Sequence, residues 1–150
     1  YIDEYSIRFK IIIPSPILLN KNMKFTIEKT EKYVLFQLNE EKLTSISAPD
    51  LKTELVTLNA EGYNNIILNM SDVKYADSSG LSSILIGNRL CSNSGGLFVM
   101  CNINDHVMKL LKISQLDTIL TLLNTVEEGI DAVFLHEIEN GLDEEEDSAE

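Results

Sequence analysis

Residues 65–85 read NIILNMSDVKYADSSGLSSIL and join two different apolar patterns. The first part, residues 65–70, is a short apolar run bounded by polar residues, which is typical of a buried parallel strand. From Leu81 onward the apolar residues recur at helical spacing, which predicts a helix that begins near Ser79. The link between the two patterns, residues 75–81 (YADSSGL), places one carboxylate and two hydroxyls at a strand-to-helix junction.

The rest of the chain alternates strand and helix patterns in the same way. Residues 24–30 and 32–38 are apolar and β-prone around Glu31, which predicts a hairpin. Ser47 is a candidate helix cap with Pro49 in the first turn. Further strands are expected at 97–101 and 118–123, and further helices around Val107 and after Thr125. Strands that alternate with helices predict an α/β domain with a partly parallel central sheet.

The last predicted helix has a clear start signal. Thr125 and Glu128 have the spacing of a capping box, in which each side chain bonds to the backbone near the other. Ile130, Val133 and Phe134 follow at helical spacing, so we expect this helix to bury these three residues.

Charged residues are distributed unevenly along the chain. The formal net charge is −12, and residues 143–150 (DEEEDSAE) hold six acidic residues and no basic one. Because phosphate binding needs a basic surface, nucleic acid is not expected as a partner. The sequence predicts an N-terminal extension at 1–22, one folded domain at 23–140, and an acidic disordered tail at 141–150.

The extension at residues 1–22 contains an apolar stretch, Ile11 to Leu19, that is interrupted by Pro14 and Pro16. The stretch is too short to span a bilayer, so direct membrane insertion is not expected. It also lacks the pattern of a signal peptide. An artefactual or disordered extension is favoured over an arm that packs on a partner.

Residues that commonly carry chemistry are few. Cys91 and Cys101 are predicted to be buried free thiols in a cytoplasmic protein, and His106 and His136 have no second ligand nearby, so no metal site is expected. Glycine-rich phosphate motifs are absent, and no cofactor is expected. Ser78 lacks the G-x-S-x-G context of a hydrolase nucleophile, so catalysis is not expected.

The DSSG stretch reads most simply as a helix N-cap, in which Asp77 or Ser78 accepts hydrogen bonds from the first turn. This reading does not exclude a function. A helix N-terminus tolerates negative charge well, because its free N–H groups and its dipole both favour an anion. A serine at this place could therefore be phosphorylated without unfolding its own domain.

Residues 65–85 resemble the signature of the STAS domain (sulfate transporter and anti-sigma factor antagonist), and the resemblance extends over residues 23 to about 140. It implies a mixed central sheet with helices packed mainly on one side. It also implies an anti-sigma factor antagonist that is phosphorylated on Ser78, with Ser79 as the rival acceptor. The implied partners are an anti-sigma factor that is also a serine kinase, and a phosphatase that removes the phosphate. The implied partner-binding residues are Asp77, Ser78, Ser79, Gly80 and Leu81.

Two other functions stay open at this point. The first is a STAS subunit of a lipid- or anion-transport assembly that uses the same helix surface for docking, and the second, ranked last, is a small serine-dependent enzyme. One segment departs from the family pattern. Many antagonists have a G-x-L-D element after the second strand, whereas residues 39–51 read NEEKLTSISAPDL with no equivalent glycine or aspartate.

Overall fold

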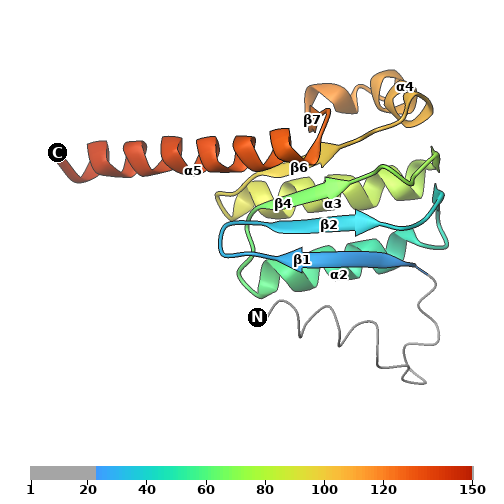
Figure 1. Ribbon diagram of the computed structural model, residues 1–150, viewed down its shortest axis with the longest axis horizontal. Helices are drawn as coiled ribbons and strands as arrows, with labels where there is room; N and C mark the ends of the chain where they lie inside the picture. The colour runs from blue at the N-terminus through green and yellow to red at the C-terminus, as the bar shows by residue number, and fades with distance from the viewer. Residues whose placement is uncertain (1–22, 150) are drawn as a thin grey trace.

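The chain forms one five-stranded sheet with helices on both faces (Figure 1). The computed structural model describes residues 23–149, with side chains as far as Gly141. The sheet has the strand order β1-β2-β4-β6-β7, and a two-stranded sheet of β3 and β5 lies apart from it. The strands are β1 (Phe25–Lys29), β2 (Val34–Leu38), β3 (Lys42–Leu43), β4 (Ile66–Asn69), β5 (Tyr75–Ala76), β6 (Phe98–Cys101) and β7 (Thr121–Leu123). The helices are α2 (Ala48–Ala60), α3 (Ser78–Asn93), α4 (Asp105–Ile113), the short 3-10 helix η2 (Leu116–Thr118) and α5 (Val126–Ala149).

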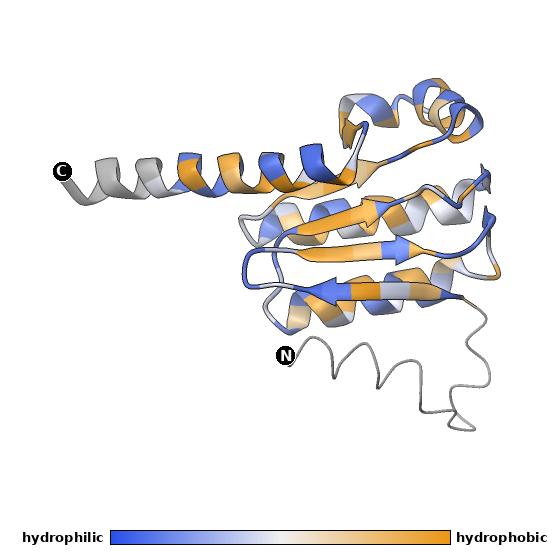
Figure 2. Ribbon diagram, viewed as in Figure 1, coloured by the Kyte–Doolittle hydropathy of each residue, from blue (hydrophilic) through white to orange (hydrophobic). Residues whose placement is uncertain are grey.

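The predicted hairpin and mixed sheet are confirmed. β1 and β2 pair antiparallel, with Ile27 opposite Phe36, whereas β2–β4, β4–β6 and β6–β7 all pair parallel. β6 is buried along its whole length, as expected for a parallel strand covered on both faces. In Figure 2, β4 and β6 are mostly orange, the hydrophobic end of the colour scale.

Alternate residues of β2, β4, β6 and β7 belong to separate apolar cores on the two faces of the sheet. On one face, Ile66 and Leu68 pack with the apolar sides of α2 and α3. On the other face, Ile67 and Val99 pack with Val133 of α5. A strand repeats every two residues, so neighbouring apolar residues must enter different cores. α2 and α3, together with buried residues of α4, therefore belong to the first core, and α5 covers the second face, so the helices lie mainly on one side, as the resemblance implies.

Three local predictions are corrected. The expected strand at 118–123 begins only at Thr121, because Gln115 adopts a left-handed conformation (φ 62°) and residues 116–118 form η2. Phe134 is 44% exposed rather than buried. It lies one position beyond Val133, about 100° further round the helix, and its ring makes a T-shaped contact with the Tyr33 ring, with a centroid separation of 6.4 Å. Ser47 occupies the N-cap position of α2 but makes no side-chain cap bond.

α5 extends to Ala149, into residues 141–150, for which an acidic disordered tail is predicted from the sequence. Its start agrees with the prediction: Glu128 N–H donates to Thr125 Oγ1 over 3.1 Å, and Glu128 Oε2 accepts from Asn124 N–H over 3.1 Å. The extension at 1–22 lies outside the described residues.

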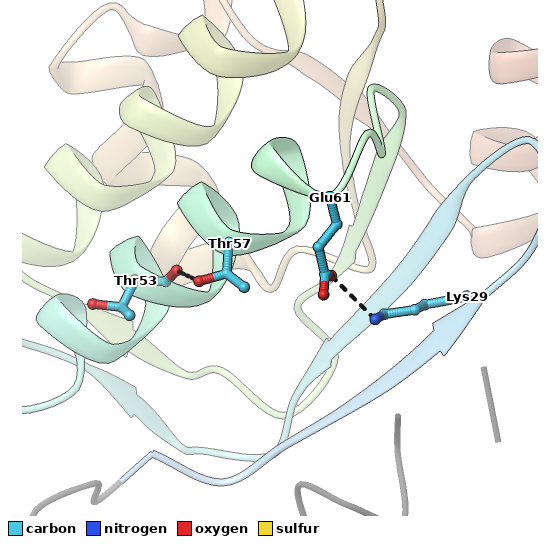
Figure 3. Close-up of polar contacts among 4 residues, drawn as sticks. All are labelled: Lys29, Thr53, Thr57 and Glu61. Carbon is cyan, nitrogen blue, oxygen red and sulfur yellow. Dashed lines mark hydrogen bonds and ion pairs between the residues drawn. The ribbon is translucent and has the colours of Figure 1, made fainter. Parts of the chain in front are cut away.

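The end of α2 is tied to the sheet edge by a lysine (Figure 3). Lys29 of β1 is only 7% exposed, and its Nζ lies 3.2 Å from Glu61 Oε1 and 5.3 Å from the centre of the Tyr63 ring. A cation near a helix C-terminus is also favoured by the helix dipole. Figure 3 also shows Thr57 Oγ1, which donates to Thr53 O over 2.8 Å within α2. Lys29 thus fixes the position of α2, whose other end borders the candidate site.

Both cysteines are buried free thiols, as predicted. Burial raises the pKa of Cys91 to about 12 and the pKa of Cys101 to about 11, the latter with help from the negative charge of Glu127. Both thiols are therefore protonated at neutral pH.

We expect neither thiol of the folded protein to react with a disulfide reagent at pH 8, and both to react in denaturant. Because the folded pKa values exceed the unfolded value of about 8.5, the free energy of unfolding should decrease as pH rises from about 9 toward about 11 to 12. Thiol titration with and without denaturant checks the first result, and urea unfolding at several pH values checks the second. Rapid labelling of the native protein would contradict the burial.

Candidate functional site

The site begins at Asp77, between the end of β5 and the first residue of α3. Asp77 has an extended backbone, and its Oδ1 accepts a hydrogen bond from Gly80 N–H over 2.9 Å. The predicted N-cap is therefore confirmed, and Asp77 rather than Ser78 performs it. The bond satisfies one of the free amides in the first helical turn and places a carboxylate at the positive end of the helix dipole.

The second carboxylate oxygen of Asp77 connects two distant parts of the chain. Asp77 Oδ2 accepts from Ser45 N–H over 3.1 Å, and Asp77 N–H donates to Leu43 O over 3.1 Å. These bonds continue the parallel pairing of β3 with β5, in which Leu43 lies opposite Ala76. Asp77 therefore holds the loop after β3 against the start of α3. Ser45 could not be predicted from the sequence, because a contact to its backbone leaves no signal in the side-chain pattern.

Gly80 makes this close approach sterically allowed. A Cβ atom at Gly80 would overlap the carbonyl oxygen of Leu43 and lie 2.9 Å from Leu43 Cγ. Any side chain would therefore push α3 away from β3. The glycine of DSSG is required by packing between two backbones, not by an unusual backbone angle.

The two serines differ from their neighbours in exposure. Ser78 and Ser79 are exposed, whereas Gly80 is buried and Leu81 is partly buried against the core. Ser83, one turn further, is buried and donates from Oγ to Gly80 O over 2.7 Å. Of the five predicted site residues, which are consecutive in the sequence, Ser78 and Ser79 are the two with exposed hydroxyls, and Ser45 and Ser82 nearby are exposed as well.

A shallow groove runs between the first turns of α2 and α3. Its lining residues are Ser45, Ala48, Pro49, Lys52, Ser79, Ser82, Ser83 and Ile86. Ser79 therefore faces this groove, which has Lys52 on its opposite wall, and Ser78 is not part of the lining. Ile46, in the loop held by Asp77, is 69% exposed. The surface around Ser78 thus combines a hydroxyl, a groove and an exposed apolar side chain.

The rings of Tyr75 and His106 lie near the same end of the fold as the candidate site. His106 of α4 stacks on Tyr75 of β5 with a centroid separation of 5.8 Å and an interplanar angle of 22°. His106 is exposed, and among residues 23–141 no histidine hydrogen-bonds to Ser78 or Ser79. Within the same residues, no group of His, Cys, Asp or Glu is arranged to hold a metal ion.

Asp77→Ala should cost more stability than the loss of an ordinary cap. We expect it to lower the free energy of unfolding by about 2–3 kcal/mol, because it removes both the cap and the charged hydrogen bond to Ser45 N–H. Asn104→Ala is the matched control, since Asn104 caps α4 through a single bond to Val107 N–H over 2.9 Å. That variant should lose about 1 kcal/mol. Equal losses in urea titrations would show that the Ser45 contact contributes nothing.

The fold and this junction identify the family. The family profile of the STAS domain matches residues 24–129, and the chain belongs to this family. Within the residues that the structure describes, no helix is both long and apolar enough to cross a membrane.

Several bacterial proteins are similar to this chain. A provisionally named anti-sigma factor antagonist of Thermotoga maritima is 36% identical over 73 residues, which are 49% of this chain and 65% of the relative. The match therefore spans less than two thirds of that relative. BtrV of Bordetella bronchiseptica, also provisionally named an anti-sigma factor antagonist, is 26% identical over 70% of this chain and 90% of its own length.

Solved structures share the fold. The crystal structure of a Thermotoga maritima protein with the same provisional description has a TM-score of 0.67 and 30% identity, and the match covers 73% of this chain and 93% of that one. SpoIIAA of Bacillus in its phosphorylated form has a TM-score of 0.59 and 25% identity over 73% of this chain and 99% of its own. These similarities confirm the STAS fold predicted from residues 65–85.

Proposed function

We propose that this STAS domain is an anti-sigma factor antagonist that binds its anti-sigma factor through the surface around Ser78, and that phosphorylation of Ser78 releases the partner. The observation that carries the proposal is Ser78, which is exposed at the first position of α3. The adjacent Asp77 carboxylate holds the loop after β3 against the start of α3. The names of the relatives support the class of function. SpoIIAA, a structural neighbour, is itself known in a phosphorylated form.

Ser78 is the better acceptor of the two serines for a geometric reason. Ser79 is also exposed, but it lines the shallow groove between α2 and α3, where α2 stands on the other side and restricts the approach of a kinase. Ser78 lies outside that lining and is exposed. The free amides at the start of α3 can partly offset a phosphate there, so the domain keeps its fold while its surface charge changes.

The proposed partner is a serine kinase that doubles as the anti-sigma factor, and both act in the cytoplasm, where ATP is available. In the reaction the γ-phosphoryl group passes from ATP to Ser78 Oγ, the hydroxyl proton is released and ADP leaves. A phosphatase then hydrolyses the phosphoserine and restores the binding surface. The antagonist supplies the acceptor hydroxyl and no catalytic group.

Ile46 is the apolar anchor that we expect the partner to cover. Its side chain is largely exposed and lies in the loop that Asp77 holds next to α3. Ile46→Ala should weaken partner binding about tenfold, since burying such a side chain contributes about 1–2 kcal/mol, and should leave stability unchanged. Val56→Ala, an exposed apolar position on α2, is the control and should bind normally. Titration calorimetry with the partner measures the affinity of both variants. Equal affinities for Ile46→Ala and Val56→Ala would show that Ile46 is not part of the interface.

Affinity purification of the native protein followed by mass spectrometry tests the proposed function against its rivals. Recovery of a protein with kinase motifs supports the proposal. Recovery of transporter subunits would favour a docking role in a transport assembly, the fold being shared with a sulfate transporter family protein of Wolinella succinogenes. Recovery of no stable partner, together with ester hydrolysis that is lost in Ser78→Ala, would favour an enzyme.

A further inference from the structure

An apolar surface on α5 lies away from the serine site. Phe134, Leu135 and Ile138 are 44%, 57% and 60% exposed, and their spacing places them on one side of the helix. The opposite side of α5 is used by the fold: Val133 is buried, and the side chains of His136 and Asn140 each lie 3.1 Å from Gly95 O. We call Phe134, Leu135 and Ile138 the outer α5 patch.

The charge around the outer α5 patch has one sign. α5 contains ten acidic residues and no Lys or Arg, although the whole chain has 12 basic residues. Along the helix, Glu127, Glu128 and Asp131 precede the patch, and the acidic run 143–147 follows it. The apolar residues therefore lie between two acidic stretches. A second copy of α5 laid on this helix would bring like charges together in either orientation.

We propose that the outer α5 patch binds a segment of a partner protein that has an apolar face flanked by Lys and Arg residues. An exposed apolar cluster of this kind on a helix marks a docking surface, and the flanking acids select a basic ligand. α5 also extends past the ends of the strands (Figure 1). α5 covers the face of the sheet opposite α2 and α3, so this surface is independent of Ser78 and of the proposed switch.

The test uses the full chain and a synthetic probe, an amphipathic Leu/Lys peptide of about 14 residues with leucines at helical spacing. A peptide of the same composition in shuffled order is the control for charge alone. We expect the amphipathic peptide to bind at least about tenfold more tightly, with an affinity that falls as salt increases. Leu135→Ser with Ile138→Ser should reduce that affinity about tenfold or more. Ile113→Ser, at a 73% exposed position on α4, should leave it unchanged.

Charge has its own variant, Asp131→Asn with Glu139→Gln, which should weaken binding at low salt and reduce the salt dependence. Equal binding of both peptides, or wild-type affinity in the Leu135→Ser/Ile138→Ser variant, would overturn the proposal. A wild-type dimer that this variant converts to a monomer would show that a second copy occupies the patch instead. Tighter peptide binding after deletion of residues 1–22 would assign the patch to the chain's own N-terminal segment.

Discussion

Ser78→Asp is expected to weaken binding to the anti-sigma factor by about a hundredfold or more, whereas Ser78→Ala should bind within about threefold of the unmodified chain. The unmodified hydroxyl is neutral and exposed at the first position of α3, so a partner surface that fits it has no need of a compensating cation. A carboxylate buried there without a partner costs several kcal/mol. Phosphoserine carries about −1.5 to −2 charges and should have a larger effect than aspartate.

The control for this prediction is the adjacent pair Ser79→Asp and Ser79→Ala. Ser79 faces the groove that contains Lys52, so a negative charge at Ser79 is partly offset within the domain. We expect its effect on affinity to be smaller than that of Ser78→Asp. Calorimetric titrations of the four variants with the same partner give the comparison, and all four should keep the unfolding midpoint of the wild type. A larger loss for Ser79→Asp would move the switch to Ser79.

Gly80→Ala is expected to lower the free energy of unfolding by about 2–3 kcal/mol and to weaken partner binding at the same time. The added methyl group would overlap the Leu43 carbonyl oxygen, which belongs to a backbone and can move only with β3. Separation of β3 from α3 would also break the bond from Ser45 N–H to Asp77 and displace Ile46.

Ser82→Ala, at an exposed position on the same helix, is the matched control and should change stability by less than about 0.5 kcal/mol. Urea unfolding measures both variants. Wild-type stability in Gly80→Ala would show that β3 and α3 can separate freely, and the proposed rigid binding surface would lose its support.

The elements that could be predicted from the sequence are those with local signals. The cap at Asp77, the capping box at Thr125 and Glu128, and the buried run of β6 all follow from residue types within a few positions of one another. The resemblance of residues 65–85 to the STAS signature added the mixed topology, which periodicity alone left as a partly parallel sheet.

The features that could not be predicted depend on contacts between distant segments. Asp77 and Ser45 are 32 positions apart, and their bond follows from the pairing of β3 with β5, two strands of only two residues each. The requirement for glycine at position 80 likewise depends on a distant residue, because it is the Leu43 backbone that leaves no room for a side chain. Helical periodicity places Phe134 in the core, but periodicity does not show how much of the helix surface the sheet covers.

Mapping the phosphate shows directly whether Ser78 is the switch. The measurement is tandem mass spectrometry of the chain after incubation with ATP and the kinase recovered with it, alongside Ser78→Ala as the blank. We expect a phosphate on Ser78 in the wild type and none in the variant. A phosphate found only at another residue, Ser79 included, would contradict this expectation.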